Sequence, residues 1–351
     1  MLTWYARGCR NRNLIIKEGE DFMIKKKAAS LKTITFVPTQ RSLYLAEKYG
    51  YDEWILNRFM HFVPNTENLI EKMLEPVPKY IRTNTLKITS KELIARLKPK
   101  GFELRMTLLT DVFEVNASNA HISIGATREY LLGYYYIQDI TSCMAVEALD
   151  IQPNQWVLDM TSAPGGKTTL MAQKMRNTGS IIAAEASPRR IRSLSFNIAR
   201  CGVMNTSIYQ MDAINCPNLS IRFDRILLDA PCSGEGMIWN DISRRSGRNP
   251  DGIAEYSQIQ KKLFETALLV LKPGGIILYS TCSFAPEENE LVVDSMLGRF
   301  NLEVEPLPFG INGLTRFGEM VFHEKLKWTV RFYPHIHNSI GFYIARLRKK
   351  S

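Results

Sequence analysis

The feature that most constrains the fold is a regular alternation of apolar and helical segments after Pro153. Short apolar segments, each typical of a buried strand, span residues 156–160, 180–184, 206–210, 223–228 and 276–280. Segments with helical spacing lie between them, after Gly166, over 189–201 and over 258–271. Strands that alternate with helices are typical of a parallel, doubly wound α/β sheet. We therefore expect an α/β domain over residues 151–351.

The chain before this domain is expected to form a second, smaller region over residues 41–150. Apolar residues recur at helical spacing from Arg41 to Glu75. Residues 80–115 follow the pattern strand, helix, strand, strand, with Ser90 as the helix N-cap, which indicates a small α+β unit. Residues 1–40 are treated as an extension that contains a basic run, Lys25–Lys27, and an alternative start of translation at Met23.

Bulk composition excludes several classes of protein. The chain has 351 residues, of which 45% are hydrophobic, so two domains with buried cores are expected. It has no run of eighteen apolar residues and no apolar signal core near its start, so we expect no membrane partner and a cytoplasmic location. Its six cysteines include no Cys-x-x-Cys pair, so we expect no metal site. A monomer is favoured.

The charge distribution points to a polyanionic partner. The net charge is +10, and residues 1–100 carry 19 Lys and Arg against 10 Asp and Glu. Residues 316–351 carry 8 basic residues against 2 acidic ones, whereas residues 101–315 carry 18 against 23. Basic ends around an acidic middle suit a nucleic acid held at the margins of a site. A generally basic, solvated surface explains the same numbers, so charge alone leaves the question open.

Polar residues follow the end of each predicted strand. They are Asp159, Glu185, Asp212, Asp229 and Cys282. In open α/β sheets, ligands bind outside the carboxyl ends of the strands. Any one of these residues alone is explained as a helix cap, but a complete row of them predicts a ligand site at this edge.

The first loop, from Asp159 to Lys167, narrows the choice of ligand. A Walker loop requires glycine at position 161, where this chain has Thr, and the Gly-x-Gly-x-x-Gly pattern of dinucleotide sites is absent. Gly165 and Gly166 still allow a ligand to approach the main chain closely. An adenosyl ligand without phosphates fits better, because its ribose needs a carboxylate at the end of the second strand, where Glu185 lies.

Two cysteines follow the ends of the last two predicted strands. Cys232 lies in a segment that begins Asp-Ala-Pro-Cys-Ser-Gly at Asp229, and Cys282 lies in Ser-Thr-Cys-Ser. A free cysteine is most often a small buried hydrophobe. Flanking polar and glycine residues at the ligand edge of a sheet instead favour reactive thiols.

These motifs resemble those of the Sun/Fmu-type family of RNA cytosine-C5 methyltransferases from about Arg41 to the end of the chain. One departure is that the family commonly has Cys-Ala-Ala before the proline of the first loop, where this chain has Thr161, Ser162 and Ala163. The matching segments are Phe223–Gly234, Tyr279–Ser283, Ala163–Lys167, Ile81–Lys87, Tyr136–Asp139, and Arg331, Pro334 and His335 followed by Gly341 and Phe342.

The resemblance implies a Rossmann-like class I methyltransferase fold that uses S-adenosyl-L-methionine to methylate C5 of cytosine in RNA. By this resemblance, Cys282 is the nucleophile that adds at C6 and Cys232 assists release of the product. Asp229 would hydrogen-bond the cytosine ring, and Lys167 would orient Asp229. The residues expected to hold the cofactor are Thr161, Ser162, Ala163, Pro164, Gly165, Gly166, Lys167, Glu185, Arg190, Asp212 and Asp229.

The RNA substrate is expected to be tRNA, because the size of the chain and its compact N-terminal unit resemble archaeal members that act on tRNA. A ribosomal RNA substrate is the alternative. The basic N-terminal unit is expected to grip the RNA backbone. Alternatively, its residues Arg82 and Asn84 are expected to line the catalytic cleft. Three other functions stay open: an inactive RNA-binding protein on this fold, a DNA cytosine methyltransferase, and a protein or small-molecule methyltransferase. The presence of both thiols favours an RNA enzyme over the last two.

Overall fold

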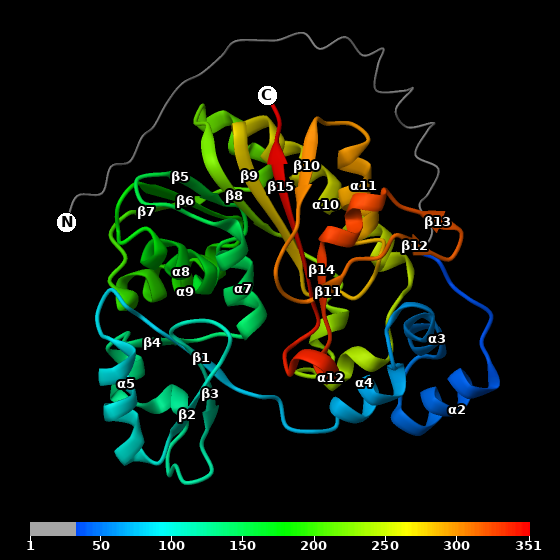
Figure 1. Cartoon of the computed structure of the whole chain (residues 1–351), viewed down its shortest axis with the longest axis horizontal. Helices are drawn as coiled ribbons and strands as arrows, with labels where there is room; N and C mark the ends of the chain where they lie inside the picture. The colour runs from blue at the N-terminus through cyan, green and yellow to red at the C-terminus, as the bar shows by residue number, and fades with distance from the viewer. Residues whose placement is uncertain (1–32) are drawn as a thin grey trace. The chain divides into compact units, whose positions relative to one another are not determined.

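A nine-stranded mixed sheet organises the protein in a computed structural model that describes residues 33–351 (Figure 1). Five strands run parallel in the order β9-β8-β5-β6-β7, which confirms the predicted parallel sheet. Met23 and the run Lys25–Lys27 lie outside the described residues. The bounds of these strands are β5 Trp156–Asp159, β6 Ser180–Glu185, β7 Thr206–Gln210, β8 Phe223–Asp229 and β9 Leu271–Thr281.

Antiparallel strands that the sequence did not reveal extend the sheet beyond β9. The long strand β15 (Phe342–Lys349) pairs antiparallel with β9, and β14 (Val330–Phe332) pairs with β15. Two further short strands complete this side, β10 (Leu302–Glu305) on β15 and β11 (Ile311–Asn312) on β14. The strands β10, β11 and β14 have two to four residues and are too short to show a period, whereas β15 has eight residues and was not identified from the sequence.

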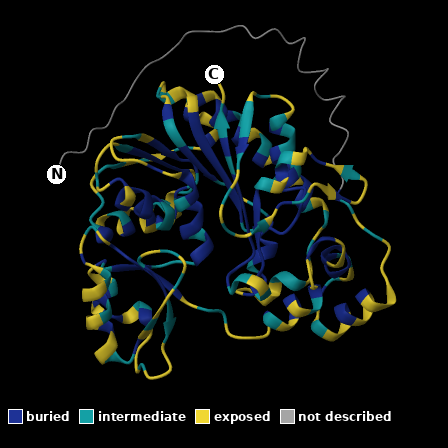
Figure 2. Cartoon of the chain, in the orientation of Figure 1, coloured by how far each residue is buried: buried dark blue, intermediate teal, exposed yellow. Residues whose placement is uncertain are grey.

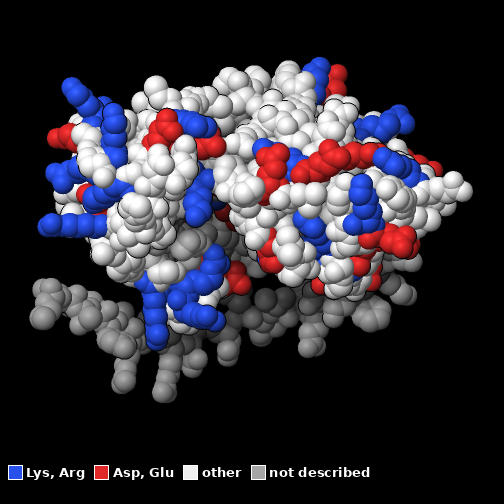
Figure 3. All heavy atoms as spheres, turned by 90° about the horizontal axis from the view of Figure 1, so that it is seen from below, with Lys and Arg blue, Asp and Glu red and all other residues white. Residues whose placement is uncertain are grey.

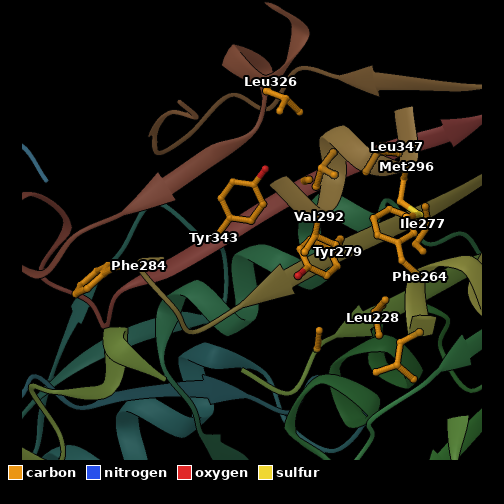
Figure 4. Packing of buried hydrophobic residues seen from close by; sticks show 14 of the residues in the cluster. Leu228, Phe264, Ile277, Tyr279, Phe284, Val292, Met296, Leu326, Tyr343 and Leu347 are labelled. Carbon is orange, nitrogen blue, oxygen red and sulfur yellow. The ribbon is translucent and has the colours of Figure 1, made fainter. Parts of the chain in front are cut away.

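Helices cover both faces of the sheet, and successive strand residues alternate between them. In β9, Ile276 and Leu278 join the core on the α7 and α8 side, whereas Ile277 and Tyr279 join the core on the α10 side (Figure 4). Phe264 of α10 stacks on Tyr279 with ring centroids 5.3 Å apart. The helices are α7 Ile140–Leu149, α8 Gly166–Lys174, α9 Pro188–Cys201, α10 Asp251–Val270 and α11 Glu290–Leu297.

The three helices near the start of the described chain pack on the same core as α10. They are α2 (Gln40–Tyr49), α3 (Glu53–Phe62) and α4 (Thr66–Lys72). Arg58 of α3 also reaches Glu287 in a buried ion pair of 2.8 Å. These helices are therefore built into the large core.

Residues 80–137 form a smaller unit with a core of its own. Its antiparallel sheet has the order β2-β3-β1-β4, and α5 (Ser90–Leu97) packs against it. Thr89, and not the expected Ser90, is the N-cap of α5, because its side chain accepts from the main-chain N–H of Glu92 in a capping box. The strands are β1 Tyr80–Thr83, β2 Glu103–Met106, β3 Val112–Asn116 and β4 Tyr135–Ile137.

The proposed boundary at residue 150 stays a prediction. The small unit has a separate core, but α2–α4 before it and α7 after it pack with the large sheet. Figure 2 shows the strands of the large sheet buried between exposed helix surfaces. Four short elements complete the fold: α6 Arg128–Leu131, α12 Pro334–His337, β12 Arg316–Phe317 and β13 Met320–Val321. No helix within residues 33–351 combines the length and apolar character needed to cross a membrane.

The structure overturns the expected role of Arg82 and Asn84 in lining the catalytic cleft. Arg82 is 2% exposed, and its guanidinium donates to Gln173 and Thr169 of α8, both at 2.9 Å. Asn84 is buried too and donates to two main-chain carbonyls, those of Gly133 and Cys201, at 2.8 Å. Both side chains therefore join the small unit to the large sheet and are not free to meet a ligand.

Replacing Arg82 by Ala should lower the free energy of unfolding by about 3 kcal/mol, because it leaves buried hydrogen-bonding groups of α8 unpaired. Denaturant unfolding measures this loss. Arg105→Ala is the control, because Arg105 lies on the exposed strand β2 and its replacement should change stability little. A stable Arg82→Ala protein with weakened RNA binding would contradict the structural role.

Candidate active site

Two cysteine-bearing loops lie side by side because β8 and β9 are paired in parallel. Asp229 at the end of β8 lies opposite Ser280 of β9. Cys232 follows the first strand and Cys282 follows the second, and their Sγ atoms are 3.1 Å apart. Both side chains are partly exposed at the ligand edge of the sheet. The structure thus brings together the two thiols that the sequence singled out.

The close contact makes the two thiols unequal. Either thiol can donate in this contact. A hydrogen bond from the S–H of Cys232 lowers the pKa of Cys282, although burial opposes ionisation. The same contact, together with burial, raises the pKa of Cys232 well above its ordinary value. Cys282 is therefore the thiol that ionises first and the stronger candidate for a nucleophile.

A partly buried ion pair lies beside the thiols. Lys167 Nζ is 2.7 Å from Asp229 Oδ2, and the hydroxyl of Ser280 donates to Asp229 Oδ1 at 2.8 Å. Burial disfavours the ammonium group, but the adjacent carboxylate outweighs that effect and raises the pKa of Lys167. The same ammonium lies 5.5 Å from the ring centroid of Phe342 on β15. The hydrogen bonds from Lys167 and Ser280 thus fix the orientation of the Asp229 carboxylate.

A cavity of about 190 Å³ opens between the first loop and the small unit. It is smaller than pockets that enclose a whole drug-sized ligand, so it suits one end of a longer molecule. At its floor, burial raises the pKa of Asp159 to about 6. The lining residues are Tyr136, Ile137, Gln138, Ser142, Asp159, Thr161, Ser162, Ala163, Pro164, Gly166, Lys167 and Asp229. Six of the first-loop residues predicted to hold the cofactor therefore line this cavity.

Hydrogen bonds from neighbouring elements hold the first loop. The Thr161 hydroxyl donates to the Asp229 carbonyl at 2.7 Å, and the Ser162 hydroxyl donates to the Ala184 carbonyl at 2.9 Å. Asn197 of α9 donates to the Pro164 carbonyl at 2.9 Å. Gly165 has φ of 106°, a conformation that favours glycine. The loop is therefore shaped before any ligand arrives.

Gly165 of the first loop does not line this cavity. The other predicted cofactor residues outside it are Glu185 at the end of β6, Arg190 on α9 and Asp212 after β7. Glu185 is buried, and its Oε2 atom accepts no hydrogen bond within residues 33–351, although Arg190 Nη1 lies 3.2 Å away. Arg190 also donates to the carbonyl of Ala163, which links α9 to the first loop. Asp212 is exposed and accepts from the N–H of Ile214 at 3.0 Å. The row of strand-end carboxylates thus continues away from the thiols.

One segment of the site was missed by the sequence analysis, namely Pro286–Glu290. Its four polar side chains are at most 1% exposed. Asn289 accepts from the hydroxyl of Thr281 at 2.6 Å and donates to the carbonyl of Ser283 at 2.9 Å, so it brackets Cys282. Glu290 pairs with Arg331 of β14. The sequence does carry a signal for this segment, because the four consecutive polar residues Glu287–Glu290 follow soon after the Ser-Thr-Cys-Ser motif of Cys282.

Close main-chain packing joins the two cysteine loops to the C-terminal strand. The N–H of Gly236 donates to the Cys282 carbonyl at 2.9 Å, and the N–H of Gly341 donates to the Gly236 carbonyl at 3.0 Å. A Cβ atom at Gly236 would lie 2.3 Å from the carbonyl oxygen of Gly341. Only glycine fits where these two segments cross. This accounts for Gly236 after the Cys232 motif and for Gly341 in the C-terminal motif.

No cluster of three or more His, Cys, Asp or Glu side chains suited to a metal ion occurs in the described part of the chain. The charged groups at this edge are the Lys167–Asp229 pair and the strand-end carboxylates. The arrangement offers a nucleophilic thiol, a second thiol in contact with it, and an oriented carboxylate beside both.

The family model described as 16S rRNA methyltransferase RsmB/F matches residues 146–348. A solved structure of a methyltransferase homolog protein from Pyrococcus horikoshii is similar with a TM-score of 0.81 and 38% identity, over 89% of this chain and 99% of that one. The structure of NSun6 from Pyrococcus horikoshii, solved with SFG, is similar with a TM-score of 0.73 and 25% identity, over 90% of this chain and 98% of that one.

Longer relatives are similar over part of their length. The human 28S rRNA (cytosine(4447)-C(5))-methyltransferase is 40% identical over 315 residues, which are 88% of this chain and 39% of that protein. The chain spans between 39% and 52% of the lengths of four such curated eukaryotic relatives.

Replacing Cys232 by Ala should raise the pKa of Cys282, because the S–H donor that favours its thiolate is lost. The pH midpoint for alkylation of Cys282 by iodoacetamide, followed by mass spectrometry, should therefore move to higher pH. Cys216→Ala is the control, because that buried thiol has no contact with the pair. A midpoint that is unchanged or lower in Cys232→Ala would show that Cys232 is not the donor.

Proposed function

The chain belongs to the RsmB/F family of RNA methyltransferases, and from that premise we propose that it methylates C5 of cytosine in RNA through a covalent adduct with Cys282. The observation that carries the proposal is the contact between Cys232 and Cys282, 3.1 Å apart, beside the Asp229–Lys167 pair. The predicted family is confirmed, and so is the class I methyltransferase fold, since the Pyrococcus horikoshii structures superpose on nearly the whole described chain.

S-adenosylmethionine is the cofactor of this family, and when bound it supplies an electrophilic methyl group. The described residues fit it. The cavity beside the first loop would hold the methionine end against Thr161–Lys167. The buried Oε2 atom of Glu185, which accepts no hydrogen bond within residues 33–351, would accept from a ribose hydroxyl. Asp212 would accept from the adenine amine, and Arg190 would brace this end.

In the proposed reaction, the thiolate of Cys282 forms a bond to C6 of cytosine, and the ring becomes an enamine whose C5 is nucleophilic. C5 would then take the methyl group and leave the cofactor as its neutral thioether. The C5 proton would pass to a base, and the electrons of that C–H bond would re-form the C5–C6 double bond as the bond between Cys282 and C6 breaks and the Cys282 thiolate leaves. Cys232, in contact with Cys282, would assist this release.

Asp229 and Lys167 would hold the ring during the addition. Asp229 lies beside the thiols and would hydrogen-bond N3 or the amino edge of the cytosine. Lys167 keeps that carboxylate oriented, because its ammonium group is 2.7 Å away. The fixed Lys167 ammonium would offset the negative charge that develops on the ring as the thiolate adds, at no cost of reorganisation.

The target cytosine must leave its stack to reach these groups. Basic side chains gather over the small unit on the face shown in Figure 3. Arg244 and Arg248 lie nearer the site, since both donate to the carbonyl of Ser233, next to Cys232. We propose that these groups hold phosphates of the RNA. The exposed basic residues of the small unit include Lys87, Lys91, Arg96, Lys98, Arg105 and Arg128.

The class of RNA remains a proposal. The sequence predicted tRNA, and we retain tRNA as a candidate. The curated relatives favour ribosomal RNA, because each of them is named as an rRNA methyltransferase. Ribosomal RNA is therefore the second candidate, and mapping the methylated cytosine decides between the two. We retain a monomer as the expected state of the protein.

The two cysteines should behave differently when each is replaced by Ala. Cys282→Ala should abolish both methylation and any covalent RNA adduct, because no thiolate can then add at C6. Cys232→Ala should still form the adduct but release it slowly, so a protein–RNA complex should survive denaturing electrophoresis. If instead Cys282→Ala traps RNA and Cys232→Ala does not, the roles are reversed. If neither traps and each loses only stability, both cysteines are packing residues.

The purified protein should bind S-adenosylmethionine but neither NAD nor ATP. Replacing Glu185 by Ala should weaken this binding about tenfold or more, because hydrogen bonds to a buried carboxylate are lost. Isothermal titration calorimetry measures both results. Glu319→Ala is the control, since Glu319 is exposed on a distant turn. Unchanged affinity in Glu185→Ala would place the ribose elsewhere.

A further inference from the structure

One carboxylate contacts both cysteine loops, in addition to the main-chain bond from Gly236 to Cys282. Glu288 Oε2 accepts from the main-chain N–H of Ser233 at 2.8 Å, and Oε1 accepts from the hydroxyl of Ser283 at 2.7 Å. Ser233 and Ser283 are the residues that directly follow Cys232 and Cys282, and their hydroxyls are 3.0 Å apart. Gln260 of α10 completes the set with a donation to Oε2 at 2.9 Å. The two loops therefore share one anchor.

Glu288 differs from its acidic neighbours Glu287 and Glu290 in its hydrogen-bonding partners. Glu287 pairs with Arg58 and Glu290 pairs with Arg331, so each has a buried cation. Within residues 33–351, Glu288 accepts from no Lys or Arg side chain, and burial raises its pKa. A buried carboxylate without a cation is costly. Its two oxygens, which carry no hydrogen when ionised, accept from three separate segments at once.

We propose that Glu288 is the positioning residue that sets the distance between the two thiols. The inference deepens the function proposed above, since it concerns the coupling of adduct formation at Cys282 to release assisted by Cys232. Glu288 itself is fully buried and touches neither sulfur nor any ligand surface. It acts through the residues next to each cysteine. Without it, the loops lose their common acceptor and the contact of 3.1 Å is no longer held.

A direct test measures how fast the two thiols form a disulfide in the free protein. Diamide accepts the two hydrogen equivalents that the thiols lose as the S–S bond forms, and mass spectrometry identifies the Cys232–Cys282 link. Glu288→Ala should slow this reaction at least about tenfold, because small displacements of reacting atoms cost rate steeply. Removing the negative charge would by itself favour thiolates and speed the reaction, so slowing reports separation of the sulfurs.

Two variants make the result decisive. Ser257→Ala is the matched control, since its hydroxyl donates to the Glu287 carbonyl at 2.7 Å and reaches neither cysteine loop. It should react at the wild-type rate. Glu288→Leu keeps a similar volume but accepts no hydrogen bond from either cysteine loop, and it should react more slowly than the wild type. If Glu288→Ala does not fold, Glu288→Leu carries the test. A wild-type rate in a folded Glu288 variant would overturn the proposal.

A second measurement links the anchor to turnover. With RNA and S-adenosylmethionine, Glu288→Ala should accumulate the covalent adduct, as Cys232→Ala should, while Ser257→Ala should not. An equal loss of formation and release, with no accumulation, would overturn the coupling. If Cys232→Ala itself traps nothing, the covalent mechanism fails, and the diamide rates still decide whether Glu288 holds the thiols together.

Discussion

The parallel pairing of β8 with β9 is the constraint on which the candidate site depends. The register places Asp229 opposite Ser280, so the loops that follow the two strands leave the sheet side by side. Two thiols 50 residues apart in sequence then meet at 3.1 Å. Lys167 reaches the same point from the loop after β5, because β5 is the other neighbour of β8. A change of one residue in this register would send Asp229 to the opposite face of the sheet.

Buried polar side chains then fix what the sheet has brought together. The segment Pro286–Glu290 directs three carboxylates to three places: Glu287 to Arg58 on α3, Glu288 to the cysteine loops and Glu290 to Arg331 on β14. Buried ion pairs contribute little net stability compared with apolar packing, but their directional contacts restrict the arrangement of the chain. Burying these three carboxylates costs desolvation free energy, and their directional contacts in return fix the positions of the two thiols.

The sequence was sufficient to predict β5 to β9 and the row of polar residues at their ends, because buried parallel strands appear as apolar runs. The meeting of Lys167, Asp229, Cys232 and Cys282 followed from the same order of strands and from the motifs. Contacts between distant segments could not be predicted. The partners of Arg82 lie 87 and 91 residues away, so its basic side chain was mistaken for a surface group. Glu288 and Ser233 are separated by 55 residues.

The central claim is that the thiol pair modifies cytosine in RNA, and bisulfite sequencing tests it most directly. RNA is compared from cells that lack the gene and express either the wild-type chain or Cys282→Ala. Because 5-methylcytosine resists deamination by bisulfite, the account predicts at least one cytosine that stays unconverted with the wild type alone. The position of that cytosine identifies the RNA as tRNA or rRNA. Identical conversion in both samples, when both proteins are present at equal levels, would contradict the account.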